Sequence, residues 1–425
     1  MKPIKRRYFA MRKIAVAALL GSLCGCTAAT ETAPPPAPAP VEQPVAVEAP
    51  APAAAIVARP FEEALMSAAN TLFSQVQPVT GESRQLVIDP LIDGVSGMQS
   101  IATRTMESRI TELVRAKYPQ FAVEPFSAAN IRKSPIVLVG TFTPVNAQGQ
   151  TTGVREAYRI CLVLADLKAG TVVSKGTARA QLPGVNHTPT PYFQDSPAWM
   201  KEGTTEAYIN TCQASKPGDP IQPVYLDGIL AATLISEAIA AYDGGRYKEA
   251  LERYSSALEM RGGNQLRVYN GVYLANLKLG RHGPATEAFG KIIEYGLNRD
   301  RLAVKFLFKP GTTAFVAEKQ LSGHYPMWMR EIARRAVQNN RCLEVVGHSS
   351  RSGLEPLNER LSLLRAEYVK KRLESEAPPL AKRTIAHGAG SRENLVGNGK
   401  DDMSDALDRR VVFQVIACSD SSKFY

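Results

Sequence analysis

Apolar positions along the chain recur with two periods, that of a helix face and that of a strand. Stretches with the helix period alternate with stretches that have the strand period. From Phe61 onward, apolar residues return at the spacing of one helix face, and strand and helix patterns then alternate up to residue 178. The last two strands flank a turn near Gly170, which predicts a hairpin. Residues 60–223 are therefore expected to form an α/β domain with a partly antiparallel sheet. The expected strands are 84–89, 121–124, 135–142, 158–166 and 171–178, and the expected helices begin at 61 and at 98.

The end of this region interrupts both periods. Between Pro183 and Pro223 the sequence is rich in Pro, Thr, Gly and Asp, which favour turns and loops over regular structure. We expect a long loop here, with one short helix near residues 199–210.

A helical repeat follows the loop. The stretch that begins at Gly245 returns at Gly280, and each copy carries a large aromatic residue, Tyr254 or Phe289, at the same offset. This pattern resembles the tetratricopeptide repeat, in which paired helices pack closely around small and aromatic residues. Two copies are fewer than the three that such repeats usually need for stability. We therefore expect residues 224–298 to pack against a neighbouring domain.

After residue 298 the pattern changes to strands and helices in the order βαβαββ. Val304, Phe306 and Phe308 alternate with other residues, which predicts a strand that ends at Pro310. This order predicts a two-layer α+β sandwich over residues 299–425. The remaining expected elements are helices 325–339 and 357–375 and strands 342–347, 384–388 and 410–418.

Three stretches of this region resemble the OmpA-like peptidoglycan-binding domain. They are Val345–Ser350, Leu357–Ala366 and Asp408–Val411, which follow the order of the family motifs Gly-His-Thr-Asp, Asn-x-x-Leu-Ser-x-x-Arg-Ala and Asn-Arg-Arg-Val. The resemblance implies non-covalent binding of peptidoglycan, with a stem peptide that contains diaminopimelate as the ligand. The residues implied for the site are His348, Ser349, Ser350, Asn358, Leu361, Ser362, Arg365 and Arg409.

The helix expected at 357–375 carries two stripes of residues. Asn358, Ser362 and Arg365 are four and three residues apart, so their side chains lie on one face. The neighbouring stripe is apolar, and we expect it to face the core while the polar stripe faces the ligand. An arginine suits a peptide carboxylate, because its planar guanidinium can donate two parallel hydrogen bonds. The apolar stripe consists of Leu357, Leu361 and Leu364.

One position departs from the family motif. Where the family has an aspartate that meets the ammonium of diaminopimelate, this chain has Ser350. A hydroxyl brings no opposite charge, so we expect binding weakened about tenfold, which corresponds to ~1.4 kcal/mol. Glu355 is a nearby acid that could substitute, and loss of binding with the fold retained is the alternative. His348 is expected to hold its loop by hydrogen bonding, and one arginine of the pair at 409–410 is expected to line the site.

The start of the chain has the layout of a secretory signal. A basic beginning precedes an apolar run too short to span a membrane, whether Met1 or Met11 is the initiator. The sequence Leu-Cys-Gly-Cys that ends at Cys26 resembles a bacterial lipobox, which implies a signal peptide over 1–25 and lipid on Cys26. Thr27, in place of an aspartate, implies export to the outer membrane. Cleavage that yields a soluble periplasmic protein is the alternative.

Residues 26–59 are rich in Pro, Ala, Val and Glu. This composition cannot bury a core and favours the extended polyproline II conformation. At ~3.1 Å per residue such a tether would reach roughly 100 Å. A lipid-anchored protein could then contact a target far from its membrane.

The α/β region at 60–223 resembles the corresponding domain of the CsgG, LpoB and FlgO lipoproteins. The resemblance rests on the series LVIDPLIDG, IVLVGTF and YRICLVLADLKAGTVV. These relatives assemble envelope machines or activate wall synthesis by contact, which implies a protein-binding domain. A structural spacer is the alternative.

Four cysteines remain once the signal is removed and Cys26 is lipidated. An even number in an oxidising compartment favours disulfides. The domain organisation favours pairing Cys161 with Cys212 and Cys342 with Cys418, each of which would stabilise the fold by about 4 kcal/mol on the chain-entropy model. Four buried thiols are the alternative.

Composition narrows the functional classes. The chain is 44% hydrophobic and 21% charged, as expected for a globular protein. Its net charge of +11 does not predict nucleic-acid binding, because six of the basic residues lie in the signal region and the others are spread out. Nucleophile elbows, Walker loops and zinc-protease motifs are absent from the sequence, and its five histidines lack metal-ligand spacing. We therefore expect no catalytic residues, no metal and no cofactor.

These patterns together predict a multidomain α/β and α+β protein on the periplasmic face of the outer membrane. It would be a lipoprotein that binds peptidoglycan and tethers or scaffolds an envelope complex, with an unknown protein partner on the helical repeats. The alternative is a subunit of a secretion or surface-structure assembly apparatus whose N-terminal domain oligomerises.

Overall fold

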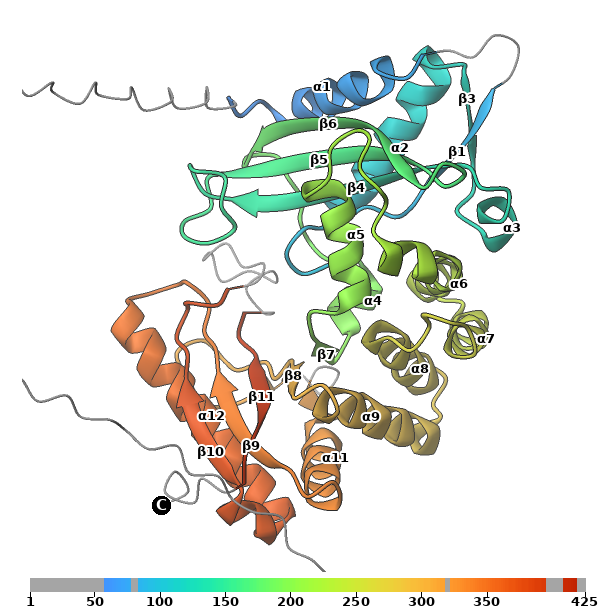
Figure 1. The fold of residues 1–425 in the computed structure, drawn as a ribbon. Coiled ribbons are helices and arrows are strands. Elements are labelled where there is room, and N and C mark those ends of the chain that lie inside the picture. The colour runs from blue at the N-terminus through green and yellow to red at the C-terminus, as the bar shows by residue number, and fades with distance from the viewer. Residues whose placement is uncertain (1–56, 78–82, 318–321, 395–407, 419–425) are drawn as a thin grey trace, which may run out of the picture. The chain divides into compact units, whose positions relative to one another are not determined.

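The computed structural model describes residues 57–77, 83–317, 322–394 and 408–418. These residues belong to the unit Ala55–Tyr425 and contain two β-sheets and a run of helices that lies between the main strands of the two sheets in sequence (Figure 1). The mixed α/β and α+β character predicted from the sequence is confirmed. The predicted signal peptide, Cys26 and the Pro-rich tether up to residue 56 lie outside the described residues.

The first sheet has a parallel part and an antiparallel part. Its main strands are β1 (Arg84–Ile88), β3 (Phe121–Glu124), β4 (Ile136–Val145), β5 (Ala157–Asp166) and β6 (Thr171–Gln181). They follow the order β3-β1-β4-β5-β6, and β2 (Ile92–Asp93) pairs with the end of β4. β1 is parallel to β3 and β4, whereas β5 is antiparallel to both β4 and β6. The single-turn helix α3 (Ala128–Ile131) lies between β3 and β4 in sequence. All residues of β4 are buried, as is typical of a central strand covered on both faces.

Helices cover both faces of this sheet. Successive strand residues point to opposite sides, so neighbouring residues of one strand pack against different helices. Leu138 packs with α1 (Phe61–Ser74) and α2 (Ile101–Lys117) in one core. Val139, the next residue of β4, packs with α5 (Gly203–Gln213) in another. The region is therefore a three-layer α/β/α sandwich.

The stretch expected to be mostly loop is more ordered than predicted. It contains α4 (Pro191–Asp195), β7 (Ala198–Trp199) and α5, which begins later than the predicted helix. β7 pairs with β8 (Arg301–Val304) of the second sheet. A strand of two residues shows no period, so this pairing has no signal in the local sequence.

Four helices follow and pack as successive pairs. They are α6 (Pro223–Asp243), α7 (Tyr247–Leu258), α8 (Leu266–Lys278) and α9 (His282–Leu297). Gly245 and Gly280 have positive φ just after α6 and α8, a conformation that favours glycine at helix ends. Tyr254 and Phe289 are buried at equivalent places in α7 and α9. The repeat predicted from the sequence is thus a repeated helix pair, and its membership of the tetratricopeptide family stays a prediction.

Among the described helices, α6 is the one long and apolar enough to cross a membrane by length and composition. Half of that stretch is buried inside the protein. Ile235 and Ala238 of α6 contribute to the same core as Tyr254 and Phe289. These contacts are typical of a core helix in a globular fold.

The second sheet has the order β10-β9-β11-β8-β7. Its strands not yet given are β9 (Cys342–Gly347), β10 (Thr384–Gly388) and β11 (Val411–Ile416). The helices of this region are α11 (Tyr325–Gln338), α12 (Glu355–Glu376) and the 3-10 helix η1 (Pro378–Lys382). β9 is parallel to β10 and antiparallel to β11. The predicted βαβαββ order is therefore confirmed. The first strand was expected to run through Phe308 but ends at Val304, and Phe306 and Phe308 pack in the core beyond it.

Both predicted disulfides are present. Cys161 is bonded to Cys212, with Cα atoms 6.1 Å apart, and this bond joins α5 to β5. Cys342 is bonded to Cys418, with Cα atoms 5.3 Å apart, and joins the start of β9 to the residues after β11. The alternative of four free thiols is excluded.

Candidate functional site

The residues implied for wall binding begin at the ends of β9 and β10. His348 follows β9 directly, and its N–H donates to the Arg410 carbonyl at 3.0 Å. The Ser349 N–H donates to the Gly390 carbonyl at 2.9 Å. The loop is thus fixed to the segments on both sides, and His348, Ser349 and Ser350 are all buried.

Helix α12 buries its polar stripe. Asn358, Ser362 and Arg365 are buried, whereas Leu357 and Leu364 are 64% and 41% exposed. The prediction that the leucine stripe forms the core face is therefore wrong. The polar residues share one face with the core residues of the second half of the helix. Those core residues are Ala366, Val369 and Leu373.

Two glycines at strand ends explain this orientation. A Cβ at Gly347 would lie 2.0 Å from the Ser362 carbonyl oxygen, and one at Gly388 would lie 2.7 Å from the Glu359 carbonyl oxygen. The helix backbone therefore lies so close to the strands that only a small side chain fits between them. The Ser362 hydroxyl occupies this place, where it donates to the Glu359 carbonyl (2.8 Å) and accepts from the Gly390 N–H (2.9 Å). A leucine in place of Ser362 would not fit.

Arg365, the predicted carboxylate ligand, is 2% exposed. Its Nε donates to the Thr312 carbonyl at 3.0 Å and its Nη2 to the Lys309 carbonyl at 3.3 Å. Its guanidinium carbon lies 4.9 Å from the centre of the Phe308 ring. Residues 308–312, which follow β8, thus cover the cation. A ligand carboxylate can use these donors only when the segment gives up its two hydrogen bonds.

Several buried polar groups here have no hydrogen-bond partner within the part of the chain that the structure describes. They are both ring nitrogens of His348, the Ser349 hydroxyl, Nδ2 of Asn358 and Nε of Arg410. Buried polar groups are nearly always paired, because an unpaired one costs about 1–3 kcal/mol. The cluster is therefore suited to a polar ligand that completes these bonds.

The electrostatics of the cluster place the cation of Arg410 beside a neutral His348 imidazole. Burial, with the charge of Arg410, lowers the pKa of His348 to about 2, so the ring offers one donor and one acceptor. Burial lowers the pKa of Arg410 to about 10, which leaves it charged at neutral pH. Its Nη1 lies 3.9 Å from Asp408 Oδ1, and its Nη2 donates to the Glu393 carbonyl at 2.9 Å. Of the arginine pair, Arg410 is therefore the buried member and Arg409 is half-buried.

The acid that was expected to substitute at Ser350 is engaged elsewhere. The Ser350 and Ser352 hydroxyl oxygens lie 2.9 Å apart. The Glu355 carboxylate accepts from the Ser391 N–H at 2.9 Å and from the Ser391 hydroxyl. Glu355 thus fixes the loop after β10. Leu361, the remaining residue implied for the site, is half-buried on α12.

Among the residues that the structure describes, no three His, Cys, Asp or Glu side chains are grouped to hold a metal ion. The chemistry offered by the cluster is that of hydrogen bonds and fixed charges. Such groups bind and orient a ligand.

Comparison with known proteins gives matches only among solved structures. Neither a protein-family model nor a curated protein matches the chain. The periplasmic domain of Helicobacter pylori MotB is 18% identical, with a TM-score of 0.22, over 29% of this chain and 77% of that one. The cell wall anchor of the type VI secretion system from Pseudomonas aeruginosa is 24% identical, with a TM-score of 0.23, over 28% of this chain and 80% of that one.

The peptidoglycan-associated lipoprotein from Burkholderia pseudomallei is also similar. It is 20% identical, with a TM-score of 0.22, over 27% of this chain and 89% of that one. These neighbours are a periplasmic domain, a cell wall anchor and a peptidoglycan-associated lipoprotein, and the similarity covers less than a third of the chain.

Proposed function

We propose that the protein is an outer-membrane lipoprotein whose C-terminal region binds peptidoglycan without a covalent bond and tethers an envelope complex to the cell wall. Lipid on Cys26 would hold one end in the membrane. The Pro-rich tether would then keep the wall at a high local concentration near the binding region. The role proposed is binding and not catalysis.

One observation carries this proposal: buried Arg365 lies on the same face of α12 as buried Asn358, whose Nδ2 has no hydrogen-bond partner among the described residues. Gly347 meets α12 at Ser362 and Ala366, the residue after Arg365. His348 and Ser349 follow that glycine directly, and within the described part of the chain their side-chain polar atoms have no hydrogen-bond partner. A stem peptide that contains diaminopimelate has a carboxylate for the guanidinium. Its amide and ammonium groups provide donors and acceptors for the others. Ligand binding would thus pair groups that are otherwise buried at a cost.

Replacing Arg365 by alanine should weaken binding to purified sacculi about 30-fold, because a charge-assisted pair contributes about 2 kcal/mol. The full chain, purified in detergent, is sedimented with increasing amounts of sacculi and the bound fraction is measured. Arg360→Ala is the matched control, because Arg360 is an exposed arginine on the same helix. Equal binding by both variants and the unmodified protein would refute the role of Arg365.

Two further measurements guard against a folding artefact. Hydrogen exchange of α12 peptides reports whether the Arg365→Ala variant retains the helix in place. Arg365→Lys keeps the charge but loses the planar fork of donors. It should bind sacculi more weakly than the unmodified protein and more tightly than Arg365→Ala.

Replacing Ser350 by aspartate should tighten sacculus binding about tenfold, or ~1.4 kcal/mol, because a carboxylate meets an ammonium with opposite charge. The same sedimentation assay measures the change. Ser352→Asp places the same charge two residues away and controls for a general electrostatic effect. Unchanged affinity of Ser350→Asp, or an equal gain in both variants, would show that position 350 does not face the ammonium.

A further inference from the structure

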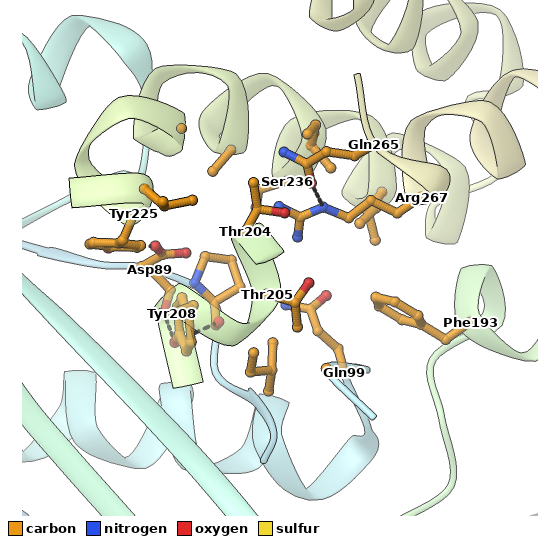
Figure 2. Close-up of a pocket in the computed structure, with 18 residues that line it drawn as sticks. Asp89, Gln99, Phe193, Thr204, Thr205, Tyr208, Tyr225, Ser236, Gln265 and Arg267 are labelled. Atoms are coloured by element: carbon orange, nitrogen blue, oxygen red, sulfur yellow. Dashed lines mark hydrogen bonds between the residues drawn. The ribbon is translucent and has the colours of Figure 1, made fainter. Parts of the chain in front are cut away.

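A second site of different character lies in the first half of the described chain. A cavity with an empty volume of ≈ 640 Å³ opens between the residues that follow β1 and helices α5, α6 and α8 (Figure 2). This volume includes space that is open to solvent, so the cavity is an open recess and not a closed chamber. The wall-binding proposal does not use this cavity.

One wall of the cavity carries an arginine, Arg267. The Arg267 Nε donates to the Gln265 Oε1 at 2.5 Å. Within the described ranges, no carboxylate lies within ion-pair distance of Arg267. Its guanidinium points into the cavity (Figure 2). A cation in this position can accept an anionic group from a ligand.

The other wall carries a buried carboxyl group. Asp89 is 5% exposed, and its Oδ2 accepts from the Tyr225 hydroxyl at 2.7 Å. Burial raises its pKa to about 7, while the hydrogen bond from Tyr225 and the charge of Arg267 lower it. Figure 2 shows Asp89 and Arg267 on different sides of the cavity, with Thr204 between them. A carboxyl group in this state can accept a cationic group from a ligand.

Between these two charges the cavity offers an unused hydroxyl and an apolar wall. The Thr204 Oγ1 is buried and has no hydrogen-bond partner in the described part of the chain. Phe193, Ile235 and Ile239 are buried side chains that line the cavity. Val224, also in the lining, is half-exposed and marks the opening. A ligand therefore meets charged groups on two walls and apolar side chains beside them.

We propose that this cavity binds a small zwitterion, an apolar amino acid or a dipeptide, whose carboxylate pairs with Arg267 and whose ammonium pairs with Asp89. The Thr204 hydroxyl donates a hydrogen bond to the carboxylate, and the apolar side chain packs on Phe193 and Ile235. This inference goes beyond wall binding and does not depend on it.

Two other ligand classes fit the cavity less well. A dianion such as a phosphate monoester would meet one cation and be repelled by the carboxyl of Asp89. A neutral apolar molecule would desolvate Arg267 and leave the Thr204 hydroxyl without a partner. A zwitterion is the class that pairs both charged groups and the hydroxyl.

Isothermal titration calorimetry on the full chain, purified in detergent, tests the ligand class. Leucine and leucyl-leucine are compared with N-acetyl-leucine, which has no ammonium, and with leucinamide, which has no carboxylate. We expect at least one zwitterion to bind, and each of the two derivatives to bind at least tenfold more weakly than leucine or leucyl-leucine. Absence of binding by both zwitterions, or equal binding by the derivatives, would overturn the proposal.

Three variants test the assigned residues. Arg267→Gln should lose at least tenfold in affinity for the zwitterion, whereas Arg261→Gln, at an exposed arginine a short way before it, should not. Asp89→Asn should bind leucine more weakly but N-acetyl-leucine as before. Unchanged leucine affinity in either Arg267→Gln or Asp89→Asn would refute that residue's role.

The third variant tests the cavity without changing a charge. Thr204→Val should weaken zwitterion binding several-fold, because it removes the unpaired hydroxyl and keeps the shape. The same variant should unfold at the same temperature as the unmodified protein or higher, since among the described residues that hydroxyl has no partner to lose. A lowered unfolding temperature with unchanged affinity would show that Thr204 is structural and would contradict the assignment.

Discussion

At pH 8, replacing Asp89 by asparagine should stabilise the folded protein by about 4 kcal/mol more than the same replacement does at pH 4. The reason is that burial raises the pKa of this carboxyl from 3.8 to about 7 in the folded state. Below pH 4 the group is protonated in both folded and unfolded chains and costs nothing. Between pH 4 and pH 7 the unfolded chain ionises first, so the unmodified protein loses stability as the pH rises. Asparagine cannot ionise, and it can still accept the hydrogen bond from Tyr225.

Urea unfolding at the two pH values measures the difference, with tryptophan fluorescence as the signal. Trp199 is a suitable reporter because its indole donates to the Ser96 carbonyl at 2.8 Å, in the turn after β2. Asp227→Asn is the control, since the Asp227 side chain is 58% exposed and pairs with Arg261. Replacing this exposed side chain should change the stability by less than about 1 kcal/mol at either pH. A pH-independent effect of Asp89→Asn would show that the carboxyl is not held protonated.

A role in ligand binding would explain why Asp89 is buried although its ionisation destabilises the fold. Glu107 is a second acid near Asp89, and burial raises its pKa to about 7. Both burial and the charge of Glu107 therefore raise the pKa of Asp89. An ammonium group in the cavity would reverse this for Asp89, because an opposite charge lowers the pKa of an acid. Binding of a zwitterion near pH 6 should then release protons. The destabilising group in the empty protein would be a binding group in the complex.

The strands of both sheets could be predicted because their patterns are local. The run Ile136–Val145 is buried throughout and apolar throughout its first half, and the hairpin around Gly170 has a turn signal between two apolar stretches. The strands of the second sheet could be predicted from the order in which short apolar stretches alternate with helical patterns. The disulfide Cys342–Cys418 could be predicted because both cysteines fall at ends of predicted strands in one domain.

Other features depend on contacts between distant segments and have no local signal. The pairing of β7 with β8 joins residues about a hundred positions apart. The cavity takes Asp89, Thr204 and Arg267 from three separate parts of the sequence. A polar residue in each part is unremarkable by itself, so sequence reasoning missed this site.

The orientation of α12 was predicted wrongly for a different reason. Helical periodicity gives two adjacent stripes, one polar and one apolar, and the usual rule buries the apolar one. The rule fails here because the helix backbone contacts the ends of β9 and β10 too closely for leucine. The signal that could have corrected the prediction is the glycine that ends each strand, Gly347 and Gly388.

Replacing Gly347 by alanine should therefore destabilise the packing of α12 by about 3 kcal/mol, at the upper end of the usual cost of overpacking. The new Cβ would lie 2.0 Å from the Ser362 carbonyl oxygen and 2.8 Å from its carbonyl carbon. These are backbone atoms, so no rotamer change can relieve the clash and the helix has to move. Hydrogen exchange of peptides from α12 in the full chain should become faster. Sacculus binding should fall as well, because Arg365 is on the displaced face.

The matched control is Gly283→Ala. A Cβ at Gly283 has nothing within 4 Å, and the residue lies in the first turn of α9. Alanine favours a helix over glycine by about 1 kcal/mol, so this variant should be neutral or slightly stabilised and should leave exchange in α12 unchanged. If Gly347→Ala left α12 as protected as Gly283→Ala does, the close approach could not be what turns the leucine stripe outward. If Gly347→Ala weakened binding to sacculi without altering exchange, the displaced group would be the loop at His348 and Ser349 and not the helix.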